Sequence, residues 1–268
     1  MKPTNLSPEH QAYLHSLQHQ KHRIVFWQIA SMVIFFALWE ILARVGVIDT
    51  FLFSSPSAIW KLFLVYLTSG ELFLHVGISV WETVLGFTIG TVVGVLIAII
   101  LWWSETLAKI CDPLLVILNA LPKTALAPIL IVWVGAGIDG IVAVAVITSV
   151  VVTILSAYNY FITVDPDKIK MLESFGANKW QILTKLILPA NVSNMMNILK
   201  INLGMSWVGV IVGEFLVSRC GIGYLIVYGG QVFRLDLVMM GVFVLAVCTW
   251  LMYAVINFAE KMVNRSRG

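Results

Sequence analysis

Long apolar stretches restrict what this chain can fold into. A helix needs about 20 predominantly apolar residues to cross the hydrocarbon core of a bilayer. Stretches that reach or approach this length cover approximately residues 25–46, 75–102, 110–134, 140–161, 189–217 and 237–259. Only 12% of the residues are charged, whereas soluble domains carry about 25%. We therefore predict an all-α polytopic membrane protein with about six transmembrane helices.

The third stretch contains Pro122 and Pro128. Proline removes a backbone donor and clashes with the preceding helical turn. A kinked or broken span is therefore expected there, with its freed backbone groups facing protein or water rather than lipid.

The distribution of lysine and arginine predicts the orientation, because cytoplasmic segments carry the excess. With both termini in the cytoplasm, residues 1–24 form a cytoplasmic segment and 261–268 a cytoplasmic tail. The inner segments then hold eleven basic residues and the outer segments four. The inner ones are Lys2, Lys21, Arg23, Lys109, Lys168, Lys170, Lys179, Lys185, Lys261, Arg265 and Arg267, and the outer ones are Arg44, Lys61, Arg219 and Arg234.

The longest inner loop contains KIKMLESFGANKWQILTKLILPA, residues 168–190. Its apolar residues fall mostly at helical spacing, which indicates an amphipathic helix. Gly176 lies in the middle and predicts a bend between two short helices. Pro189 suits the first turn of the next span. The predicted apolar stripe comprises Leu172, Phe175, Trp180, Leu183 and Ile187, and its charged rim includes Glu173, Lys179 and Lys185.

This bent element has two interpretations. One is an interfacial helix pair on the membrane surface, with its lysines near anionic headgroups. The other is a compact knob that inserts into a groove on a soluble partner. A central glycine suits a compact knob better than a helix lying flat on lipid.

Two further features concern helix contacts. Gly86, Gly90 and Gly94 line one face of the second span, so that another helix can approach closely. That helix belongs either to the same subunit or to a second copy. Outside the spans, Ser55 and Pro56 predict the cap and first turn of an outer helix over residues 52–69, which we expect to lie in the membrane interface.

Charged residues inside spans are costly and normally face the bundle interior or water. Lys123 beside Pro122 is a candidate for an aqueous pathway that attracts anions. Glu214 near the outer end of the fifth span either lines or gates a pathway or forms a structural hydrogen bond between helices.

No clustered catalytic set or metal-ligand spacing is visible. The chain also lacks the GxxxxGK[ST] phosphate loop, so no catalytic residue, metal or cofactor is assigned to it. The remaining classes are a permease driven by a separate ATPase and a secondary transporter with its own ion-coupling site. Few intramembrane acids and a strong cytoplasmic docking element favour the first.

The bent element over residues 168–190 resembles the sequence signature of a known protein family. Gly176 is followed by nine residues and then Leu186, Ile187, Leu188 and Pro189. This pattern resembles the cytoplasmic signature of binding-protein-dependent ABC importer permeases, EAA-x3-G-x9-I-x-LP. Lys170, Met171 and Leu172 stand in place of the EAA.

Within that class, the chain resembles the nitrate, sulfonate, taurine and bicarbonate subfamily. The subfamily version of the signature matches at Ser174, Phe175, Gly176, Ala177 and Trp180. Residues 54–60, 75–94, 112–137 and 213–226 are also similar, so the resemblance extends from about residue 30 to about residue 260.

The resemblance implies a type-1 transmembrane domain over 25–260 in a bacterial inner membrane. It also implies two ATPase subunits that bind ATP and Mg²⁺, a second permease copy or a related chain, and an external solute-binding protein. The expected cargo is a small anionic or organic solute. The ATPase would bind the coupling element, residues 165–188, chiefly through Lys170, Met171, Leu172, Glu173, Ser174, Phe175, Gly176 and Ala177, with Pro189 at its end.

Overall fold

The computed structural model describes residues 8–265, which form helices joined by short turns. Lys2 and Arg267, which were counted as cytoplasmic charges, lie outside the described residues. The elements in chain order are α1 (Pro8–Val45), α2 (Thr50–Phe53), α3 (Pro56–Ser69), α4 (Glu71–Trp103), α5 (Glu105–Ala120), η1 (Lys123–Leu126), α6 (Ala127–Val134), α7 (Ile138–Ile162), α8 (Pro166–Ser174), α9 (Lys179–Ile182), η2 (Leu183–Ile187), α10 (Leu188–Ala190), α11 (Val192–Val217), α12 (Ile222–Gln231) and α13 (Leu235–Arg265).

Within residues 8–265, five helices are long and apolar enough to cross a membrane, or up to six if the bent pair counts as one span. The five candidate spans are His22–Val45, Glu71–Trp103, Ile138–Ile162, Val192–Val217 and Leu235–Val263. The bent pair is α5 with η1 and α6, whose axes turn by 88° at Leu121 and Pro122. The break predicted from Pro122 and Pro128 is therefore confirmed, and Pro128 lies in the first turn of α6.

Helices α4, α7 and α11 pack against one another and form the centre of the bundle. The glycine face of α4 meets α7 of the same chain: Gly86 lies against Ala145, Gly90 against Ser149 and Gly94 against Thr153. A Cβ atom at Gly86 would lie 2.4 Å from the Ala145 Cβ. Small residues thus allow two long helices to approach more closely than larger side chains would.

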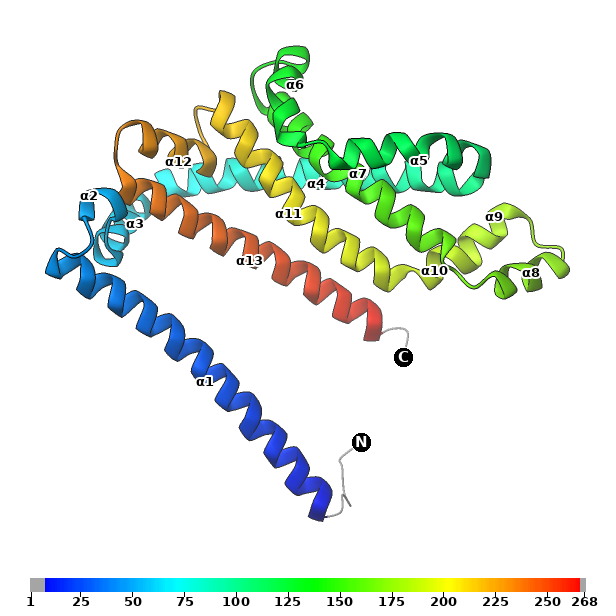
Figure 1. Ribbon diagram of the computed structural model, residues 1–268, viewed down its shortest axis with the longest axis horizontal. Helices are drawn as coiled ribbons and strands as arrows, with labels where there is room; N and C mark the ends of the chain where they lie inside the picture. Colours follow the sequence, from blue (N-terminus) through cyan, green and yellow to red (C-terminus); the bar gives the residue numbers. More distant parts are fainter. Residues whose placement is uncertain (1–7, 266–268) are drawn as a thin grey trace.

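The two ends of the bundle differ in structure. Figure 1 shows α2, α3 and α12 together at one end, and α8–α10 and the carboxyl end of α13 toward the other. Helix α1 diverges from α13 toward its amino end, and no residue in its most apolar stretch is buried (Figure 1). Residues 8–24 of the predicted cytoplasmic segment are continuous with the first span, because α1 is one helix from Pro8 to Val45.

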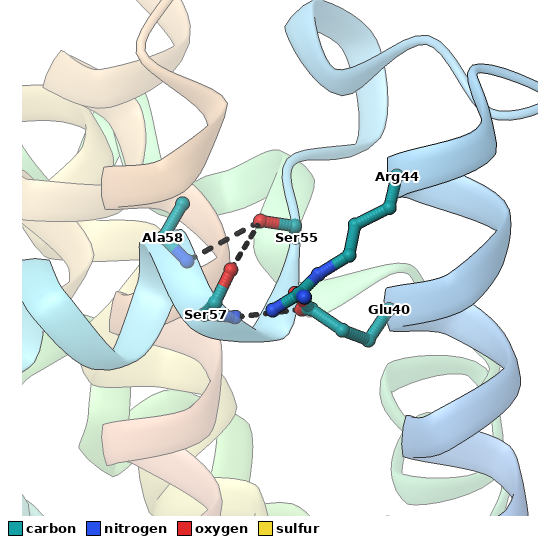
Figure 2. Close-up of polar contacts among 5 residues, drawn as sticks. All are labelled: Glu40, Arg44, Ser55, Ser57 and Ala58. Carbon is teal, nitrogen blue, oxygen red and sulfur yellow. Dashed lines mark hydrogen bonds and ion pairs between the residues drawn. The ribbon is translucent and has the colours of Figure 1, made fainter.

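A polar contact joins α1 to the start of α3, as Figure 2 shows. The Ser55 hydroxyl accepts from the Ala58 N–H at 3.3 Å and Pro56 occupies the first turn, so the predicted cap is confirmed. The Glu40 carboxylate accepts from the Ser57 N–H at 3.0 Å and from Arg44 Nε at 2.7 Å. One carboxylate therefore neutralises Arg44 and also fixes α3 against α1.

Candidate coupling site

The first helix of the coupling element has a defined beginning and end. The Asp165 carboxylate accepts from the Asp167 N–H at 3.0 Å, and Pro166 provides the first helical residue of α8. At the other end, the Gly176 N–H donates to the Glu173 carbonyl at 2.9 Å, and the Ala177 N–H donates to the Leu172 carbonyl at 3.0 Å. This pair of bonds is a Schellman cap, which requires a left-handed residue. Gly176 provides it with φ 79°, so the predicted bend is confirmed.

The second helix begins with a capping box. The Asn178 side chain accepts from the Gln181 N–H, and the Gln181 side chain accepts from the Asn178 N–H, both at 2.9 Å. Asparagine followed three residues later by glutamine is a signal that could have located this start from the sequence.

Pro189 does not begin the next span as predicted. The chain continues from α9 through a π-helical turn, Leu183–Ile187, into α10, and α11 begins only at Val192. Proline cannot donate to the carbonyl four residues earlier. A π turn, which changes the hydrogen-bonding register, accommodates this loss without ending the helical path.

One side of the element packs on the ends of the spans. Ile182, Leu183 and Ile187 are buried in a cluster with Phe161 at the end of α7. Leu172 and Ala177 pack against the same cluster. In addition, Lys179 Nζ donates to the Trp103 carbonyl at the end of α4, at 3.2 Å. The element is thus attached to both α4 and α7.

The other side exposes large apolar groups. Phe175 at the bend is 82% exposed, Trp180 is 60% exposed and Met171 is 53% exposed. We call these three residues the exposed apolar patch. The charged side chains of Lys168, Lys170 and Glu173 are also exposed.

The single apolar stripe predicted from the sequence is therefore wrong in one respect. Leu183 and Ile187 face inward and Leu172 packs inward, whereas Phe175 and Trp180 are exposed. The inward and outward residues divide on each side of Gly176, because each short helix packs one face on the spans and exposes the other.

The two charged residues assigned to a pathway lie in different settings. Lys123 Nζ donates to the Asn119 carbonyl at 2.9 Å, at the carboxyl end of α5. A lysine at this position satisfies a terminal carbonyl and interacts favourably with the helix dipole. Glu214 is fully buried and accepts from Ser79 Oγ of α4 at 2.5 Å. The arrangement of Glu214 corresponds to the interhelical hydrogen bond that the sequence left open as one alternative.

Among residues 8–265, no three histidine, cysteine, aspartate or glutamate side chains are grouped so that they could hold a metal ion.

Membrane-length helices in a bundle, with a bent element outside the spans, define a polytopic membrane protein. Residues 90–268 match the family described as "binding-protein-dependent transport system inner membrane component". The chain belongs to this family. It is a permease subunit of an ABC importer, in which a separate subunit hydrolyses ATP.

Relatives and solved structures agree with this membership. The chain is 27% identical to the putative aliphatic sulfonates transport permease protein SsuC of Bacillus subtilis, over 87% of this chain and 84% of that protein. It is 22% identical to the taurine transport system permease protein TauC of Escherichia coli, over 92% and 91%. An inward-facing structure of the MetNI methionine ABC transporter has the same fold, with a TM-score of 0.61 and 18% identity over 70% of this chain and 92% of that chain.

Proposed function

We propose that residues 165–188 bind an ABC ATPase subunit and transmit its motion to the membrane helices. The observation that carries this proposal is the exposed apolar patch on an element whose other side is packed on α4 and α7. Figure 1 shows α8 and α9 beyond the ends of these helices, where a soluble partner could reach them. Solvent-exposed aromatic groups with a charged rim are typical of protein interfaces.

The attachments of the element provide the mechanical connection. The ATPase would bind Phe175 and Trp180, while Lys179 and Ile182 connect the same element to the ends of α4 and α7. A partner shifts a conformational balance only by binding the two states with different affinity. A shift from 1:99 to 99:1 requires about 5.5 kcal/mol of differential binding.

The same proposal implies which end of the helical bundle faces the cytoplasm. The coupling element would lie in the cytoplasm with both termini, in agreement with the excess of lysine and arginine there. The helices α2, α3 and α12 would then face the solute-binding protein, and the transmembrane domain would extend over residues 25–260. Glu214 would anchor α12 at this outer end, and Lys123 would lie beside the broken third span as a candidate pathway residue.

The proposed assembly contains two copies of this chain, two ATPase subunits that bind ATP and Mg²⁺, and one external solute-binding protein. The proposed cargo is a small anionic or organic solute of the sulfonate, taurine, nitrate or bicarbonate type. Support for this class comes from relatives named for aliphatic sulfonates and taurine. A further relative of Chloroflexus aurantiacus is named for riboflavin, so uptake assays should also include larger organic solutes.

Phe175→Asp tests the coupling proposal. A carboxylate placed in an apolar groove loses hydration without gaining a partner. The affinity of the permease for its ATPase should fall at least about 10-fold, which corresponds to about 1.4 kcal/mol. Binding should be measured between the permease in nanodiscs and the host's purified ATPase subunit. Phe175→Met, which keeps an apolar side chain, should bind as wild type does. Equal affinity for all three proteins would contradict the proposal.

A further inference from the structure

Two carboxyl groups meet inside the spans, where α4, α11 and the beginning of α12 join. Glu82 of α4 is 1% exposed and Glu214 of α11 is 0% exposed. Ser79, three residues before Glu82 on the same side of α4, donates to the Glu214 carboxylate at 2.5 Å, so the two carboxyl groups are neighbours. The coupling function described above uses neither group, and their arrangement therefore needs a separate explanation.

Glu214 is surrounded by hydrogen-bond donors. Its Oε1 accepts from Ser79 Oγ at 2.5 Å, and its Oε2 accepts from the N–H groups of Gly223 at 2.5 Å and Tyr224 at 3.3 Å. The two N–H groups belong to the first turn of α12, which carries the positive end of the helix dipole. An ionised carboxylate is the form that accepts such a set of bonds best.

Glu82 has the opposite surroundings. Its Oε2 is buried and has no hydrogen-bond partner among the described residues. None of the lysine or arginine ion pairs within residues 8–265 includes Glu82 or Glu214. Two adjacent carboxylates cannot both remain charged in such a site, because the repulsion between them adds to the cost of desolvation.

We propose that Glu82 and Glu214 hold one proton between them. Glu82 carries it as a neutral carboxylic acid and donates its O–H to the carboxylate of Glu214. The buried carboxyl group of Glu82 then has a hydrogen bond, and the site keeps a single negative charge at the amino end of α12.

The geometry favours a proton over a metal cation. A Cβ atom at Gly221 would lie 2.3 Å from Glu214 Oε2, and one at Gly223 would lie 2.8 Å from the same atom. The space around this carboxylate is therefore already filled by backbone. The N–H groups that point at its oxygens would also repel a cation.

The neighbouring titratable groups leave the proton on the pair. On α4, His75 Nδ1 accepts from the Gly221 N–H at 2.9 Å, so this nitrogen carries no proton. Tyr224 of α12 stacks on His75 with ring centroids 6.0 Å apart. Glu71 is the first residue of α4, four residues before His75. At the α7 side, apolar Ile141 packs against Gly213 of α11.

The proton makes the junction sensitive to pH. The folded state then binds more protons than the unfolded state, and stability falls as pH rises. Full ionisation would drive α4 away from the link between α11 and α12.

Glu82→Gln tests the proposal, because its amide can donate to Glu214 without an ionisable proton. The thermal midpoint of the purified permease–ATPase complex should fall as the pH rises for wild type. The same rise in pH should lower the thermal midpoint of Glu82→Gln by less. Glu105→Gln, which removes an exposed acid from an ion pair with Lys109, should keep the wild-type pH dependence. The thermal midpoint should be lower for Glu214→Gln than for Glu82→Gln, because the NH₂ group of a glutamine at position 214 would face other donors.

Infrared spectroscopy of the wild-type protein provides a second readout. Wild type should show a buried carboxylic-acid C=O band at neutral pH that is absent in Glu82→Gln. The proposal would be overturned if wild type lacks this band, or if Glu82→Gln keeps it. It would also be overturned if Glu214→Gln is tolerated while Glu82→Gln is not. The infrared outcomes do not depend on whether the 165–188 element binds an ATPase.

Discussion

Gly209→Ala is expected to lower the free energy of unfolding by about 3 kcal/mol, the upper end of the usual range for overpacked cores. Gly209 of α11 lies against α7. A Cβ atom there would be 2.4 Å from the Ala145 Cα and 2.9 Å from the Ala145 nitrogen. These are backbone atoms, which no rotamer change can move aside. The two helices would have to separate along their whole contact.

Gly204→Ala is the matched control, because Gly204 lies in the same helix and an added Cβ would meet nothing within 4 Å. Alanine also favours a helix by about 1 kcal/mol relative to glycine, so this variant should be as stable as wild type or slightly more so. The measurement is denaturant-induced unfolding in detergent, followed by circular dichroism. If Gly209→Ala and Gly204→Ala lost the same free energy of unfolding, α7 and α11 would not be packed as described.

Gly176→Pro is expected to abolish ATPase binding, with a loss of at least about 100-fold in affinity, or about 2.7 kcal/mol. Gly176 has φ 79°, whereas proline is restricted to φ near −65°. The Schellman cap of α8 would be lost, because proline also lacks the N–H that donates to Glu173. The exposed side chain of Phe175 would then point in a different direction relative to Trp180.

Gly176→Asn is the control for this change, because asparagine adopts left-handed backbone angles more readily than other side chains. It should retain most of the binding. Co-purification of the permease with its ATPase from mild detergent measures the effect, and gel filtration of the permease alone shows whether the spans remain folded. Retained ATPase with a folded Gly176→Pro permease would argue against a docking role for the bend.

The spans and the local signals could be predicted from the sequence because each depends on neighbouring residues. Apolar length located the spans, paired prolines located the break at Pro122, and Gly176 located the bend. Ser55 and Pro56 marked the start of α3. In each case the determining interaction lies within a few residues of the chain.

Features that depend on helix register could not be predicted in the same way. The meeting of Glu82 with Glu214 and of Gly209 with Ala145 joins residues far apart in the chain. The apolar stripe of the coupling element was wrong on both sides of Gly176, because Phe175 before it and Trp180 after it are exposed and apolar spacing alone does not show which face packs inward. The π turn before Pro189 was also missed, since its sequence is indistinguishable from that of an ordinary helix.

Photo-cross-linking from position 175 tests the central claim most directly. A photoreactive phenylalanine analogue would replace Phe175, and a second protein would carry it at Phe73, which is also exposed but lies near the beginning of α4. Each permease would be irradiated in native membranes with its ATPase present. We expect a cross-link to the ATPase from position 175 and none from position 73. A cross-link only to lipid from position 175 would instead mean that the element lies on the membrane surface.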